Sequence, residues 1–205
     1  AFPLAKAAAG RALELDETQG EPHAALGLIK TVFDWDWTGV ERESKRAIEL
    51  APSSADAHLY RSVYLVWMGR FDESVGEARR ALELDPLTLT RRVQGGWTLY
   101  YARRHDESSA ELGKVLELDP RVAYANMELG WNYAEKRMYP EAAARCGTAL
   151  EQAPDDPTIL GSCGRVLGLA GQRRQALDLL ARMKRMSEQR YVDPYNIAVL
   201  CDGLN

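Results

Sequence analysis

Apolar and small residues recur along this chain in a pattern that repeats. The segments that close each repeat alternate small, apolar and acidic residues and end in proline or glutamate: Ala12–Glu17, Ala47–Pro52, Ala81–Pro86, Val115–Pro120 and Ala149–Pro154. Their last residues are 35, 34, 34 and 34 positions apart, and a further step of 34 reaches Glu188. A period this regular indicates an array of supersecondary units that stack on one another.

Small side chains also keep the same register inside each repeat, counted from the third residue after its predecessor's terminal Pro or Glu. Position 8 holds Gly27, Ser62, Gly96, Gly130, Gly164 and Ala198. Position 20 holds Ala5, Ser74, Ser108, Ala142 and Ala176, with Val40 as the bulky exception. Because small side chains let two helices approach closely, these positions predict where helix A of a repeat crosses helix B. Gly69 and Gly171 suit a left-handed helix stop between the two helices.

A 34-residue helix–turn–helix repeat with these small residues resembles the tetratricopeptide repeat (TPR) family over essentially the whole chain. The resemblance implies an all-α fold, a right-handed superhelical solenoid of antiparallel helix pairs with about twelve helices and no strands. The expected boundaries are a lone B helix in 1–19, whole repeats at 20–54, 55–88, 89–122, 123–156 and 157–190, and a lone A helix in 191–205. The repeat at 20–54 has one extra residue, which we place in the turn Phe33–Trp37. Since natural arrays normally end in a polar cap, the half-repeats predict a fragment of a longer protein.

Several segments are also similar to a bacterial subgroup in which TPR arrays are fused to winged-helix transcription regulators, nucleotide cyclases or protein kinases. They are Asp34–Trp37 with Glu41–Glu43, Gly69–Glu73, Tyr100–Arg104 and Arg190–Tyr195. This resemblance implies an alternative function, as a regulatory or sensory segment of a larger regulator or signalling enzyme.

In the TPR family, positions 2, 5, 6, 9, 12 and 13 of each repeat line the concave wall. Here that wall is rich in Trp and Tyr, which give much contact area at little entropic cost and dominate binding hot spots. The candidate partner-binding residues are Tyr60, Trp67, Gln94, Trp97, Tyr100, Tyr101, Tyr124, Glu128, Trp131 and Arg165. The resemblance therefore implies a protein–protein interaction scaffold that binds a partner peptide or protein in an aromatic groove. The alternative, that several of these side chains pack between neighbouring A helices, stays open.

Some TPR modules hold acidic chaperone tails through a carboxylate clamp of Lys, Asn and Arg. The corresponding positions here are Leu59, Val63, Val93, Gln94 and Trp97. Because no clamp is present, we do not expect binding of chaperone tails.

No catalytic or metal-binding constellation is found in the sequence. His23, His58 and His105 lie in three different repeats, without the spacing of metal ligands. We expect His105 to fill the joint between helices. Cys146, Cys163 and Cys201 occupy core-facing positions in the family frame, where a free cysteine behaves as a small hydrophobe. The sequence thus predicts no enzyme, no metal and no cofactor.

Net charge and the distribution of apolar residues limit the classes of partner that this chain is expected to bind. The 205 residues carry a net charge of −4, which argues against a direct nucleic-acid binder. No run of 18 apolar residues is present, so no membrane span is predicted, and no targeting segment is predicted from these residues. Reduced thiols favour a reducing, cytoplasmic location. A further alternative is self-association as a homodimer, in which the apolar residues Ile197, Val199 and Leu200 of the open C-terminal helix pair with a second copy.

Overall fold

The computed structural model describes residues 2–205, which form twelve α-helices, one short π-helix and no strand. In chain order these are α1 (Phe2–Leu15), α2 (Gly20–Ile29), the π-helix η1 (Lys30–Asp34), α3 (Trp37–Leu50), α4 (Ala55–Trp67), α5 (Phe71–Leu84), α6 (Leu89–Tyr101), α7 (His105–Leu118), α8 (Ala123–Glu135), α9 (Tyr139–Gln152), α10 (Pro157–Leu169), α11 (Arg173–Ser187) and α12 (Pro194–Asp202). Even-numbered helices are A helices and odd-numbered helices are B helices. The expected all-α class with about twelve helices is confirmed.

Helix starts and stops follow local chemistry. The side chains of Ser54, Asp156 and Asp193 accept hydrogen bonds from backbone N–H groups in the first turns of α4, α10 and α12. Such caps satisfy donors that a helix start leaves without a partner. Pro157 and Pro194 occupy the first turns of α10 and α12, where the missing N–H costs nothing.

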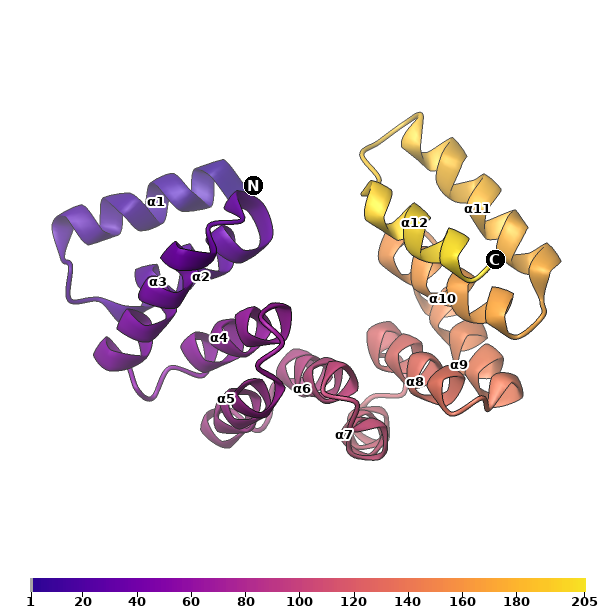
Figure 1. Cartoon of the computed structure of the whole chain (residues 1–205), viewed down its shortest axis with the longest axis horizontal. Helices are drawn as coiled ribbons and strands as arrows, with labels where there is room; N and C mark the ends of the chain where they lie inside the picture. Colours follow the sequence, from indigo (N-terminus) through magenta and orange to yellow (C-terminus); the bar gives the residue numbers. More distant parts are fainter. Residues whose placement is uncertain (1) are drawn as a thin grey trace. The chain divides into compact units, whose positions relative to one another are not determined.

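The chain divides into two compact units, which are described separately (Figure 1). The N-terminal unit ends at Arg104 and contains α1 to α6. Within it α2 packs on α3, α4 packs on α5, and the A helices α2, α4 and α6 follow one another. The C-terminal unit, His105–Asn205, contains α7 to α12, with α8 on α9, α10 on α11, and α8, α10 and α12 in succession.

In the repeats at 55–88 and 123–156 the small residues lie where the two helices of the pair cross, as expected. A Cβ atom built on Gly130 would lie 2.7 Å from Cys146 Sγ and 3.2 Å from the carbonyl oxygen of Ala142. In the repeat at 55–88, Ser74 Oγ donates a hydrogen bond to the carbonyl oxygen of Ser62, 2.7 Å away. Position 8 of helix A therefore meets positions 20 and 24 of helix B, and only a small side chain fits between the backbones.

Every turn between an A helix and its following B helix contains one residue with positive φ. Gly69 and Gly171 have φ of 69° and 76°, as the sequence led us to expect. Arg103, Arg137 and Trp35 have φ of 60°, 59° and 57° at the equivalent point of their turns. The residue after each of the four regular turns donates its N–H to a carbonyl five residues earlier, at 2.9 Å. This is the Schellman arrangement, and it requires the left-handed conformation.

The extra residue of the repeat at 20–54 is taken up by η1, at the end of helix A. One added residue widens the last helical turn, and Trp35 then begins the turn into α3. The predicted insertion point, Phe33–Trp37, overlaps this π-helix. Such widened turns are frequent at functional sites.

Each compact unit has its own core. In the C-terminal unit Met127, Ile159 and Cys163 are buried together with Cys146, where α8, α9 and α10 meet. In the N-terminal unit Val40, Tyr64 and Leu65 form a cluster on which Trp37 packs. A second cluster joins Ala24, Ala47 and Ala57.

Candidate functional site

Three aromatic side chains gather on α6 in the N-terminal unit. The rings of Trp97 and Tyr101, one helical turn apart, have centroids 4.6 Å apart at 53°. Tyr100 meets Tyr101 edge to face, with centroids 5.3 Å apart. All three side chains are partly exposed. Amphipathic rings in such arrangements offer a partner both stacking surface and polar edges.

The neighbouring helix α4 adds Tyr60 and Trp67. Trp67 is 54% exposed, and Tyr60 is half-buried, which raises the pKa of its phenol. Arg91 at the start of α6 pairs with Asp56 at the start of α4, with Nη2 and Oδ1 2.6 Å apart. This ion pair ties the first turns of the two helices together.

The C-terminal unit has a sparser set of candidate residues. Tyr124 of α8 is 40% exposed, and its hydroxyl donates a hydrogen bond to Asp156 Oδ2 at 2.9 Å. Trp131, two turns further along α8, is partly exposed. Arg165 of α10 pairs through Nε with Asp202 Oδ2 of α12, 2.8 Å away.

Glu128 differs from the other candidates because its side chain is buried. The residue is only 3% exposed, and its Oε2 atom has no hydrogen-bond partner among the described residues. Burial raises the pKa of this carboxyl well above its ordinary value. A desolvated carboxyl favours the neutral form, so Glu128 adds little negative charge to the surface of α8.

The structure thus brings the predicted residues together in two groups, one in each compact unit. Tyr60, Trp67, Gln94, Trp97, Tyr100 and Tyr101 lie on the adjacent helices α4 and α6, and Tyr124, Glu128, Trp131 and Arg165 lie on the adjacent helices α8 and α10. That they bind a partner stays a prediction.

The histidines take part in polar pairs inside the repeats. Nδ1 of His23 lies 2.7 Å from Glu43 Oε2, and Nδ1 of His58 lies 2.5 Å from Glu77 Oε2. In each repeat the pair joins position 4 of helix A to the equivalent helical turn of helix B.

The same place in other repeats carries different chemistry. Arg145 donates to Asn126 Oδ1 at 3.2 Å, whereas Leu160 and Leu179 pack as hydrophobes. Sequence inspection missed these pairs, although His and Glu recur 20 and 19 residues apart. His105 instead reaches forward, with Nδ1 3.2 Å from Asn132 Oδ1 of α8. This contact agrees with its expected place in a joint between helices.

Cys146 and Cys163 are buried side by side as free thiols, and Cys201 is partly exposed. A hydrogen bond with Cys146, together with burial, raises the pKa of the Cys163 thiol well above its ordinary value. A thiol that is neutral and inaccessible is a poor nucleophile. These two cysteines therefore act as core residues.

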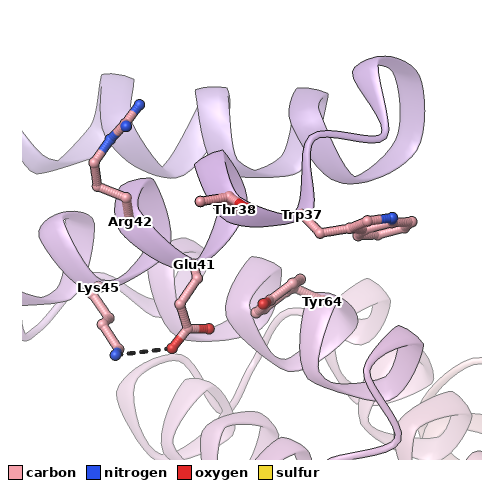
Figure 2. Close-up of a pocket in the computed structure, with 6 residues that line it drawn as sticks. All are labelled: Trp37, Thr38, Glu41, Arg42, Lys45 and Tyr64. Carbon is pink, nitrogen blue, oxygen red and sulfur yellow. Dashed lines mark ion pairs between the residues drawn. The ribbon is translucent and has the colours of Figure 1, made fainter.

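A pocket that the sequence did not indicate lies between α3 and α4 (Figure 2). It has a volume of about 490 Å³ and is lined by Trp37, Thr38, Glu41, Arg42, Lys45 and Tyr64. In Figure 2 Lys45 and Glu41 extend toward each other on the side of Tyr64, while Arg42 points away. Forming the pocket requires Trp37 and Tyr64, 27 residues apart, to pack together, which no local motif reveals.

Residues 2–205 contain neither a metal-binding cluster nor a membrane-spanning helix. The structure there holds no cluster of three or more His, Cys, Asp or Glu side chains placed to bind a metal ion. Across the same residues, none of the helices has the length and apolar character needed to cross a membrane.

Comparison with known proteins places the fold. No family model matches the chain, and no curated protein matches it. Among solved structures, TTC0263, a thermophilic TPR protein in Thermus thermophilus, is 16% identical over 90% of this chain and 98% of that one, with a TM-score of 0.74. PilW, a type IV pilus biogenesis factor, is 16% identical over 100% and 91%, with a TM-score of 0.75. YrrB, a TPR protein with an unusual peptide-binding site, is 19% identical over 85% and 89%, with a TM-score of 0.57.

These similarities show that the chain has the TPR fold, an all-α array of antiparallel helix pairs. The expected class, inferred from the 34-residue period and the small residues at the crossings, is therefore confirmed.

Proposed function

We propose that this chain is a protein–protein interaction scaffold that binds a partner peptide or protein on the aromatic surfaces of its A helices. The observation that carries the proposal is the aromatic group on α6, where Trp97 and Tyr100 each contact the ring of Tyr101 and all three residues are partly exposed. Rings already packed against one another lose little freedom when a partner binds, which reduces the entropic cost of association. The TPR fold of YrrB, described as having a peptide-binding site, supports the same class of function.

The proposal predicts that binding depends on these rings and not on aromatic exposure in general. An affinity capture from lysate of the source organism would compare the parent with Trp67→Ala/Tyr101→Ala in the N-terminal unit and Tyr124→Ala/Trp131→Ala in the C-terminal unit. Tyr191→Ala is the matched control, because Tyr191 is 83% exposed and lies outside the A-helix surfaces. Circular dichroism would verify equal helicity.

A partner lost with either double variant but retained by Tyr191→Ala supports the proposal, and the more damaging variant identifies the unit that binds. A partner that both double variants retain would refute it. That result would favour the alternatives, a regulatory segment acting within a larger protein or a self-association module. Sedimentation at several concentrations tests the last of these, and a strict monomer would eliminate it.

A further inference from the structure

The pocket between α3 and α4 combines an aromatic wall with an exposed cation. Trp37, at the start of α3, is partly exposed and packs on Tyr64 of α4, which is buried. Lys45 lies two turns further along α3 and is 58% exposed in its side chain. A volume of about 490 Å³ falls within the range of small-ligand pockets and exceeds what one side chain fills.

Three cations lie around Glu41, the carboxylate that lines this pocket. The Glu41 carboxylate lies 2.9 Å from Lys45 Nζ, 3.5 Å from Arg61 Nη2 and 3.2 Å from Arg70 Nη1. Burial of Glu41 opposes ionisation, but the hydrogen bond from Lys45 and the charge of Arg61 outweigh it and lower the pKa of Glu41 to about 2. One carboxylate therefore faces three cations.

The two arginines are held by additional carboxylates, and Lys45 is held more loosely. Arg61 also contacts Glu77 and Arg70 also contacts Glu73, whereas within residues 2–205 the ion pair of Lys45 is with Glu41 alone. Exposed pairs between residues four apart on a helix contribute little to stability. Lys45 can accordingly turn to an incoming carboxylate, while Arg61 and Arg70 keep Glu41 neutralised.

We propose that this pocket binds an acidic residue of a partner protein together with the apolar side chain next to it. The carboxylate pairs with Lys45 Nζ, and the apolar side chain lies against the exposed face of Trp37. The neighbouring Arg42 also lines the pocket, but it points away from Lys45 and pairs with Glu43 at 3.1 Å (Figure 2). A nucleic acid is disfavoured, because its affinity comes from many phosphates that are neutralised together, whereas Lys45 can pair with one anionic group.

This site is separate from the aromatic surfaces of the A helices, because its charged groups come from the B helix α3. It can therefore be present or absent whatever the outcome for the proposed function, and it is tested with probes that need no identified partner.

The test is a titration of the full chain with three blocked dipeptides: acetyl-Glu-Phe-amide, acetyl-Gln-Phe-amide and acetyl-Glu-Ala-amide. The readout is the NMR signal of the Trp37 indole Nε1–H, which is assigned by its loss in Trp37→Phe. We expect a saturable shift with the Glu-Phe peptide, and binding about tenfold weaker when the carboxylate or the ring is removed.

Lys45→Gln should weaken binding of the Glu-Phe peptide by a similar factor, about tenfold. Lys114→Gln is the matched control, because Lys114 is 55% exposed in its side chain and forms a comparable pair with Glu111 on another B helix. Lys114→Gln should leave the affinity unchanged. Absence of a saturable Trp37 shift, equal binding of the Gln-Phe peptide, or full affinity in a folded Lys45→Gln protein would each overturn the proposal.

Discussion

Replacing Glu128 should make the protein more stable at neutral pH. Its carboxyl is 3% exposed, and Oε2 has no hydrogen-bond partner among the described residues. An unsatisfied buried polar group costs about 1–3 kcal/mol. Glu128→Met has a similar shape and removes the polar atoms, so we expect a gain of about 1–3 kcal/mol in the free energy of unfolding. For a chain of this size that corresponds to a rise in Tm of about 2–4 °C per kcal/mol.

The effect of replacing Glu128 on the free energy of unfolding should also depend on pH. Because burial raises the pKa of Glu128, the folded protein holds this proton more tightly than the unfolded chain does. The contribution of Glu128 to stability is therefore fully present below the unfolded pKa of about 4.5, and it is lost as pH rises toward the folded-state value. Glu128→Gln cannot titrate, so its advantage over the parent should grow with pH.

The assay is urea unfolding followed by circular dichroism, at a series of pH values from mildly acidic to mildly basic. Glu151→Gln serves as the control, because Glu151 is an exposed carboxylate at the end of α9 in the same compact unit. If the curves of stability against pH for Glu128→Gln and the parent run parallel, the carboxyl is not desolvated as described. The reasoning would then be wrong.

Three further predictions concern a left-handed turn, the crossing of helix A with helix B, and the loss of stability at acid pH. Arg137→Gly should stabilise the protein by about 1 kcal/mol in thermal melts, since its φ of 59° strains a residue with a Cβ; Arg137→Ala should not. Gly130→Ala should cost about 1–3 kcal/mol, because the added Cβ would lie 2.7 Å from Cys146 Sγ, and an unchanged melt would contradict the crossing. Burial of Glu43 opposes ionisation, but hydrogen bonds with His23 and Lys30 outweigh it and lower its pKa to about 2. The stabilising contribution of Glu43 should be complete above about pH 4.5 and disappear as pH falls toward 2. In urea titrations, the free energy of unfolding of Glu43→Gln should therefore fall less over this pH range than that of the parent.

The sequence predicted the repeating architecture well because one packing requirement recurs in every repeat. A small residue occupies position 8 of every repeat, so its period is visible without any structure. The left-handed turns were predicted only at Gly69 and Gly171. Arg137 adopts the same conformation against its local preference, because the crossing of α8 and α9 dictates the turn between them.

The candidate site was harder to predict, for a different physical reason. Helical spacing says which side of an A helix a residue occupies, but not how deeply neighbouring helices cover it. Glu128 and Trp131 are equally plausible wall residues in the sequence, yet the first is buried and the second is partly exposed. Likewise, the pocket between Trp37 and Tyr64 depends on packing between residues of two different repeats.

The pairs at position 4 bear on how the chain avoids assembling incorrectly. Arrays of similar repeats are prone to mispairing during folding, because any helix A resembles the correct partner of any helix B. Here the matching residues differ: His58 with Glu77, Asn126 with Arg145, and Leu160 with Leu179. If α8 were to dock on α11, Asn126 Oδ1 would face a leucine in place of Arg145, at a cost of about 1–3 kcal/mol. The different pairs thus favour the pairing of each helix A with its own helix B. The repeats at 20–54 and 55–88 share the His–Glu combination, so this contact does not distinguish their helices.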